Sequence, residues 1–391
     1  MKELLAKKKS FVIPILFLSV VLISFEAHAV AESSIKNYNG TLLVGVVGDT
    51  GIGERAYRPG FIAVIKALRK HQPDLLLHLG DFLYQPKIFP KTCPERYLHE
   101  VRKTFVDPFQ FKLFAPGDND LPPNKKKPKG SGCWEKIDAM DNSFDSYPTS
   151  THEPRTYEGT AIIANSFFAI LNTYPWQDPK LWLGPRIKKA KKQGLWTIIV
   201  LHEPPMTTAW YLEKRDTVLK QLTQLGPDLV LSGNQHSYER FHQIGVPNPD
   251  GSIPYVSSET GNYSKGDGTI FVVSGGGGAY LKPFADQQGF KKRTAPKPVF
   301  DTLAKRALMN HYLILEIEQE TLKVTTHRVC PEINTSNTEN PRWKEDKPMW
   351  DAITLECEGQ AKGVTAFDQF QIQLKKRSAH KNKINQRINF R

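Results

Sequence analysis

Polar side chains of types that bind metal ions stand at the ends of three apolar runs in this chain. Asp49 ends LLVGVVGD, Asp81 ends LLLHLGD with Tyr84 just after it, and Asp118 ends FKLFAPGD. Several carboxylates crowd together readily only when cations neutralise them. Carboxylate, phenol and imidazole ligands suit hard or borderline cations such as Fe, Mn and Zn. These residues therefore predict a metal site built from several strand ends.

Two later apolar runs end in residues of the same kind. LWTIIVLHEPP carries His202, and PDLVLSGNQH carries Asn234 and His236. One Asp placed between two cations can bridge them, and two cations about 3.5–4 Å apart can activate a water and stabilise both ends of an in-line displacement at phosphorus. The whole set is typical of metal-assisted hydrolysis of a phosphate ester.

The stretches between these runs indicate how the side chains are positioned. PGFIAVIKALRK spaces Ile62, Ile65 and Leu68 at helical intervals, and a second predicted helix begins at Pro94. This strand–helix–strand rhythm predicts a parallel α/β core, in which ligand sites lie beyond the carboxyl ends of the strands. The runs at 269–279, 311–319 and 322–329 predict later strands, which we expect to be antiparallel.

Five short blocks in this order resemble the calcineurin-like metallophosphoesterases, and within them the purple acid phosphatase group. They are GDTG (48–51), GDFLY (80–84), GDND (117–120), LHEPP (201–205) and GNQHSYER (233–240). The resemblance covers roughly residues 40–330. It implies an α/β (α+β) fold of two packed mixed β-sheets flanked by helices, which is the four-layer sandwich of these metallophosphoesterases. It also implies a phosphomonoesterase of the acid phosphatase type or a phosphodiesterase.

The resemblance implies a set of seven metal ligands at the strand ends: Asp49, Asp81, Tyr84, Asp118, His202, Asn234 and His236. Asp81 would bridge two metal ions, whose identity is left open among Fe, Zn and Mn. Asp49, Tyr84 and His236 would complete the first position, and Asp118 and His202 the second, with Asn234 as a further ligand.

Three residues depart from the family pattern. The family's Asn ligand is Asp118 here, its next residue, a His, is Asn119, and the His that opens the last block is Asn234. Asp118 keeps an oxygen ligand, whereas an amide such as Asn119 cannot act as a general acid near neutral pH. From their places in the family pattern, we assign the catalytic positions to Asp118, Asn119 and His202. Sliding the block by one residue would instead make Asn119 the ligand, and we prefer the unshifted register.

These departures motivate an alternative function. The chain could be a catalytically weakened or non-catalytic homologue that binds phosphorylated ligands or polyanions. Metal content separates the two hypotheses, because an enzyme of this kind should hold about two metal ions per chain and a non-catalytic homologue should hold fewer.

The N-terminal sequence predicts export. Residues 1–29 combine a basic start, an apolar run and the small-residue site Ala27-His28-Ala29, which is the layout of a signal peptide cleaved after Ala29. An uncleaved anchor is the alternative, but the apolar run is short for a spanning helix. We expect a periplasmic or secreted protein with a catalytic domain at 36–330 and a C-terminal extension with a basic tail at 331–391.

The formal charge of +13 favours anionic partners. We expect a phosphorylated small molecule or other phosphoester as substrate, and weak contact of the basic tail with polyanions or anionic membranes. We expect no specific nucleic-acid partner. The four cysteines allow three pairings that sequence cannot separate, although nearness along the chain favours Cys93–Cys133 and Cys330–Cys357.

Overall fold

The computed structural model describes residues 40–53, 58–84, 93–123, 130–140, 145–146, 157–330, 357, 360 and 362–375. The predicted signal peptide at 1–29, the segment 331–356 and the chain beyond residue 375 lie outside the described residues. Within the described part of the chain, every helix is too short or too polar to cross a bilayer.

Two mixed β-sheets form the centre of the fold, as predicted. In spatial order, the first sheet contains β12 (Asn262–Ser264), β17 (Gly363–Gln373), β16 (Thr321–Cys330), β15 (Asn310–Ile317), β1 (Leu42–Val47), β2 (Leu75–His78) and β3 (Phe111–Phe114). The second contains β14 (Leu303–Ala307), β9 (Tyr238–Phe241), β13 (Ile270–Ser274), β8 (Leu229–Ser232), β7 (Trp196–Leu201), β6 (Ser166–Ile170), β5 (Gly159–Ile163) and β4 (Asp145–Ser146). A small separate ribbon pairs β10 (Gln243–Ile244) with β11 (Tyr255–Val256).

The strands that lead to the predicted ligands run parallel. β1 pairs with β2 and β2 with β3 in the first sheet, and β7 pairs with β8 in the second. The later strands β15 and β16 are antiparallel to their neighbours, as predicted. β13, which we also expected to be antiparallel, pairs parallel with β8 on one side and antiparallel with β9 on the other. Because parallel neighbours end at the same edge of a sheet, the polar residues after these strands are brought together.

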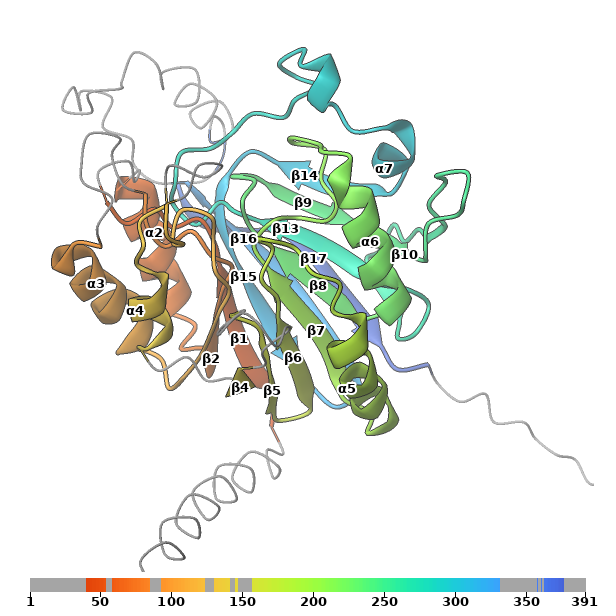
Figure 1. Ribbon diagram of the computed structural model, residues 1–391, viewed down its shortest axis with the longest axis horizontal. Coiled ribbons are helices and arrows are strands. Elements are labelled where there is room, and N and C mark those ends of the chain that lie inside the picture. The colour runs from red at the N-terminus through yellow and green to blue at the C-terminus, as the bar shows by residue number, and fades with distance from the viewer. Residues whose placement is uncertain are drawn as a thin grey trace, which may run out of the picture.

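Helices cover both outer faces and complete the four layers (Figure 1). On the first sheet lie α2 (Arg58–Arg69), α3 (Glu95–Val101), which continues into a π-helical turn at Arg102–Val106, and α4 (Trp134–Asp138). On the second lie α5 (Lys180–Lys192) and α6 (Lys214–Leu225). The short α7 (Lys297–Asp301) follows a 3₁₀ turn at Lys291–Arg293.

Three apolar cores fill the spaces between the four layers. In β2, Leu77 faces the core between the sheets and Leu76 faces the core beneath the helices of the first sheet. In β7, Ile198 faces the same central core and Ile199 faces α5 and α6. Alternate residues therefore bury on opposite faces, which explains why these strands are apolar throughout rather than alternating.

Strand β17 corrects the predicted end of the domain at residue 330. Gly363–Gln373 lies between β12 and β16 in the first sheet, inside the segment that we predicted to be an extension. Its buried residues recur at every second position, as in Asp368, Phe370 and Ile372. This period of two is a strand signal. It is weak in the sequence because one of the buried residues is charged.

The disulfides join the cysteines that are neighbours along the chain. Cys93 bonds to Cys133 and Cys330 bonds to Cys357. The first links the segment before α3 to the start of α4, on either side of the GDND block. The second links the end of β16 to the segment that leads into β17.

Candidate metal centre

The predicted ligands follow parallel strands of both sheets: Asp49 after β1, Asp81 and Tyr84 after β2, Asp118 after β3, His202 after β7, and Asn234 and His236 after β8. Asp49, Asp81 and His202 each offer a ligand atom, and these atoms lie within 4.8 Å of one another. All three side chains are buried. The Nε2 atom of His202 lies 3.4 Å from Oδ2 of Asp81 and 3.6 Å from Oδ1 of Asp118.

His202 is oriented as a metal-binding imidazole would be. Its Nδ1 lies 2.6 Å from the carbonyl oxygen of Leu79, which fixes the ring. Its Nε2 is buried and has no hydrogen-bond partner among the described residues. Buried polar atoms without a partner are uncommon, and metal-ligating histidines usually use the other ring nitrogen for a bond of this kind. The residues present therefore fit a divalent cation.

Tyr84, Asp49 and His236 form a second group beside Asp81. The Tyr84 hydroxyl lies 3.1 Å from Oδ1 of Asp49 and 2.9 Å from Nε2 of His236, and that Nε2 lies 3.2 Å from Oδ1 of Asp49. The Nδ1 of His236 bonds to the carbonyl oxygen of Tyr280. One imidazole and oxygens from two other residues thus converge, as a site for a hard or borderline cation requires.

The backbone at these strand ends is strained. Asp49, Asp81 and Asn234 have φ of 55°, 55° and 63°, in the left-handed region, which is uncommon for residues other than glycine and which Asp and Asn tolerate best among them. Close packing explains the glycines that precede two of the predicted ligands, Asp118 and Asn234. A Cβ at Gly117 would lie 2.1 Å from the backbone nitrogen of Asp81, and one at Gly233 would lie 2.6 Å from Oδ2 of Asp49. Conformations of this kind cost roughly 1–3 kcal/mol each and collect at functional sites.

Burial and the neighbouring charges shift the pKa values of two groups in this site. Burial, with the charges of Asp49 and Asp81, raises the pKa of the Tyr84 phenol well above its ordinary value. Burial opposes a charge on His202, but Asp81 and Asp49 outweigh it and raise the pKa of His202 well above the ordinary value. A bound cation would replace these protons, because it supplies the positive charge that the carboxylates require.

Two residues of the GDND block lie against the buried group. Asp118 is the member that faces His202. Asn119 covers Asp81 instead, with its backbone N–H 2.9 Å from Oδ1 and its Nδ2 2.7 Å from Oδ2. Asp120 is buried and accepts the backbone N–H groups of Leu83 and Gly117, so its function is to hold the turn.

Sequence reasoning missed Tyr174 and Glu203, which border the site on the side of Asp118. The Tyr174 hydroxyl lies 2.8 Å from Oε2 of Glu203 and 3.4 Å from Oδ1 of Asp118. Asn234 donates from Nδ2 to the same Oε2 at 2.9 Å. Glu203 had a detectable signal, since a charged residue directly follows a buried strand and His202. Tyr174 lies in the loop after β6 and had none.

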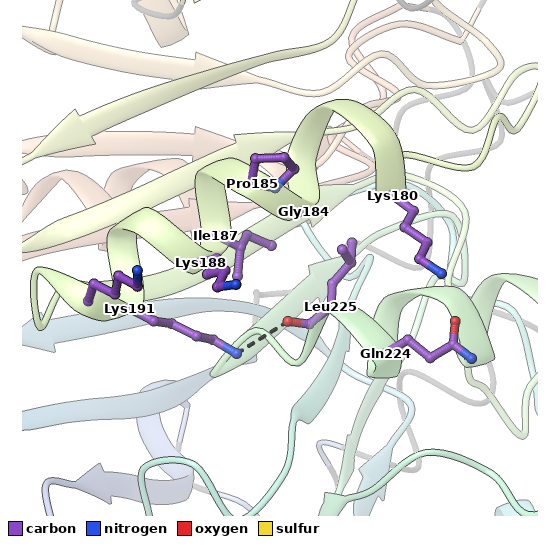
Figure 2. Close-up of a pocket in the computed structure, with 9 residues that line it drawn as sticks. Lys180, Gly184, Pro185, Ile187, Lys188, Lys191, Gln224 and Leu225 are labelled. Carbon is purple, nitrogen blue, oxygen red and sulfur yellow. Dashed lines mark hydrogen bonds between the residues drawn. The ribbon is translucent and has the colours of Figure 1, made fainter.

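A separate basic groove of about 750 Å³ lies between α5 and α6 (Figure 2). The residues that line it are Lys180, Gly184, Pro185, Ile187, Lys188, Lys191, Lys192, Gln224 and Leu225. Lys191 points across it and donates from Nζ to the carbonyl oxygen of Leu225 at 3.2 Å. No strand-end ligand lines this groove, so it is distinct from the metal centre.

Comparison with known families identifies a match over the part of the chain that builds this site. The model of the calcineurin-like phosphoesterases matches residues 42–238, which is just over half of the chain and includes every predicted ligand. A search of the curated proteins found no match.

A solved structure with a TM-score above 0.5 shares the fold at low identity. A purple acid phosphatase from yellow lupin (Lupinus luteus) seeds aligns with a TM-score of 0.56 and 14% identity, over 87% of this chain and 55% of that chain. The structure of PhoD aligns with a TM-score of 0.49 and 9% identity, over 85% of this chain and 70% of that chain. The chain thus spans little more than half the length of the lupin enzyme, and at this identity the likeness concerns the fold alone.

Proposed function

Because the chain belongs to the calcineurin-like phosphoesterase family, we propose that it hydrolyses phosphate esters with two divalent metal ions held at the strand ends. The observation that carries the proposal is the buried group of Asp49, Asp81 and His202. In this group the Nε2 atom of His202 faces carboxylates, and this nitrogen has no hydrogen-bond partner among the described residues. We assign the bridging position to Asp81, which lies between the two groups of ligands.

Each metal position has its own residues. Asp49, Tyr84 and His236 would hold one cation, and Asp118, His202 and Asn234 the other. Cations in such a pair supply an activated water and neutralise charge on the phosphoryl group. The protein fixes the ligands through the carbonyl oxygens of Leu79 and Tyr280, which orient the two imidazoles.

Asn119 bears on the choice of substrate. Its amide donates to Asp81 and cannot deliver a proton to a departing alkoxide near neutral pH. We therefore expect esters whose leaving group departs without protonation, such as aryl phosphates, to be the better substrates. Whether monoesters or diesters are preferred is tested with matched pairs of both.

The decisive experiment combines metal analysis with turnover. Asp81→Asn should lose bound metal and hydrolysis of p-nitrophenyl phosphate, because an amide does not neutralise or bridge two cations. The control is Asp107→Asn at an exposed position after α3. If Asp81→Asn keeps wild-type metal content and turnover, the proposed site is wrong.

A non-catalytic role is the second candidate, favoured by Asn119 and Asn234 where the resembling family has histidines. Such a protein would bind phosphorylated ligands without hydrolysing them. Wild-type protein that holds metal and binds a phosphorylated ligand, yet turns over neither a monoester nor a diester panel, would establish this role in place of hydrolysis.

We also propose that the chain is exported. The basic and apolar character of residues 1–29 motivates this, and the two disulfides support it because disulfides persist mainly in oxidising compartments. Mass spectrometry of the mature protein should show an N-terminus close to Val30. An intact Met1 on the protein in its native compartment would contradict cleavage.

A further inference from the structure

Glu203 joins residues on three different elements beside the second metal position. Its Oε2 lies 2.8 Å from the Tyr174 hydroxyl and 2.9 Å from Nδ2 of Asn234. The same hydroxyl lies 3.4 Å from Oδ1 of Asp118. Glu203 is only 8% exposed. A nearly buried carboxylate thus contacts one proposed ligand directly and a second through Tyr174.

Arg215 holds the other oxygen of this carboxylate. Its Nη2 lies 2.8 Å from Oε1 of Glu203, and its guanidinium also donates to the carbonyl oxygen of Trp210. Arg215 extends from α6 and is 1% exposed. A buried guanidinium has no acceptor capacity and keeps its charge, so it fixes which oxygen of Glu203 is turned toward Asn234.

This arrangement determines the orientation of the Asn234 amide. A carboxylate only accepts hydrogen bonds, so Glu203 can be satisfied by the NH₂ group of Asn234 and not by its carbonyl. The backbone N–H of Asn234 is also fixed, because it donates to Oδ2 of Asp49 at 2.8 Å. None of the described residues donates to the Oδ1 atom of Asn234. That oxygen is therefore the atom left to coordinate a cation.

We propose that Glu203 is a positioning residue that turns Asn234 into an oxygen ligand of the second metal ion. This rests on the proposed metal-dependent function. The independent sign that a cation belongs there is the buried Nε2 of His202. It lies 3.4 Å from Oδ2 of Asp81 and 3.6 Å from Oδ1 of Asp118, and it has no hydrogen-bond partner among the described residues.

The consequence concerns the class of cation. With Asp81, Asp118 and Asn234 as oxygen ligands and His202 as the imidazole, the second position is richer in oxygen than a site with two imidazoles. Oxygen ligands suit harder cations such as Mn²⁺ better than imidazoles do, so the preference of this position for Zn²⁺ should be smaller than that of a site with two imidazoles. Glu203 therefore contributes to metal selectivity without touching the metal.

Glu203→Gln tests the proposal through metal binding. Arg215 requires an acceptor, so the introduced glutamine should keep its oxygen there and turn its NH₂ toward Asn234. The Asn234 amide must then rotate and present its own NH₂ to the cation. Isothermal titration with Mn²⁺ should show the first ion bound as before and the second about tenfold or more weaker, the usual range for loss of such an outer partner. The control is Glu213→Gln, an exposed change nearby.

A second substitution separates positioning from folding. Adding Asn234→Asp to Glu203→Gln supplies a side chain with oxygen on both sides, so one oxygen can accept from the introduced amide while the other faces the cation. We expect this pair to regain the second Mn²⁺. Asn234→Asp alone places a carboxylate against Glu203 and should not improve binding.

The outcomes separate this inference from the proposed function. Wild-type protein that binds no Mn²⁺ or Zn²⁺ overturns the metal-dependent function itself. Wild-type protein that binds two ions, with Glu203→Gln unchanged, overturns only the role of Glu203. If Glu203→Gln loses the second ion and the double variant does not regain it, Glu203 supports the site structurally and the proposed amide orientation is wrong.

Discussion

At the scale of single residues, Asn119 is the substitution whose consequence for chemistry is most direct. Its amide donates to Oδ2 of Asp81 at 2.7 Å, so it helps to hold the carboxylate to which we assign the bridging position. An imidazole at the same place could also exchange a proton with a leaving group near neutral pH. The side chain thus keeps a positioning role while lacking acid–base capacity.

Asn119→His should therefore raise turnover selectively. We expect kcat for an alkyl phosphate monoester to increase by about tenfold to a hundredfold, since a positioned general acid contributes on the order of 10²–10⁴ in rate. Turnover of p-nitrophenyl phosphate should change little, because p-nitrophenolate leaves without protonation. Steady-state kinetics with both substrates checks this, with Asn119→Gln as the control. Equal gains for both substrates would argue against a missing general acid.

Glu158 gives a pH prediction for stability. It is 2% exposed just before β5, and its Oε1 accepts the backbone N–H of Asn172. Burial raises the pKa of Glu158 from 4.5 to about 7. The folded state therefore favours the protonated form of Glu158. The stability that this protonation contributes is fully present below pH 4.5 and is lost as the pH rises through about 7.

Glu158→Gln should remove that dependence, because an amide does not titrate. As the pH rises from about 4.5 to about 8, the free energy of unfolding of the variant should increase relative to that of wild type by up to roughly 3 kcal/mol. This follows because one pKa unit corresponds to about 1.4 kcal/mol. Denaturant unfolding of metal-free protein at several pH values measures it. A constant difference between the two proteins across this range would contradict the shifted pKa.

At the scale of elements, the Tyr-Glu-Arg sequence that follows His236 anchors the end of the site to the other sheet. In β9, the Tyr238 hydroxyl lies 2.7 Å from Oδ2 of Asp368, and Arg240 contacts both oxygens of that carboxylate at 2.6 and 3.1 Å. Asp368 belongs to β17 of the other sheet. A buried charge pair thus joins the two sheets at β9, the strand that directly follows two of the predicted ligands.

Asp368→Asn should be strongly destabilising. The Arg240 and Asp368 side chains are each 6% exposed, and removing one partner leaves an uncompensated buried charge. Such a loss typically costs about 3–5 kcal/mol. The control is Asp267→Asn, whose partner Lys375 is 60% exposed, and which should cost less than about 1 kcal/mol. Similar unfolding midpoints for the two variants would show that the buried pair contributes little.

Sequence reasoning succeeded at elements that carry local signals. The buried runs before Asp49, Asp81 and His202 are continuous and end in turn residues, so both their strand character and the shared edge were predictable. β17 was missed because its pairing with β16 is non-local and its buried face includes Asp368. Tyr174 was missed because loop position alone says nothing about which side chains it will meet.

At the scale of the whole molecule, the site depends on the packing of two sheets and on an unbalanced charge. Asp49 and Asp81 follow strands of one sheet, and His202 and His236 follow strands of the other, so the centre forms only when both sheets have folded and packed. The full sequence carries a formal charge of +13, and a basic protein as a whole favours association with anions.

The charge leads to a test of how substrate reaches the site. If the field of the whole protein accelerates encounter with a phosphate monoester, kcat/KM should fall several-fold between about 20 and 200 mM salt, because the Debye length shortens over that range, while kcat stays constant. Deleting residues 376–391 removes six positive charges and no negative charge, which lowers the formal charge of the full sequence from +13 to +7. It leaves β17 intact. The truncated protein should therefore fold and turn over normally with a shallower salt dependence. An unchanged slope would mean that the tail takes no part in attracting the substrate.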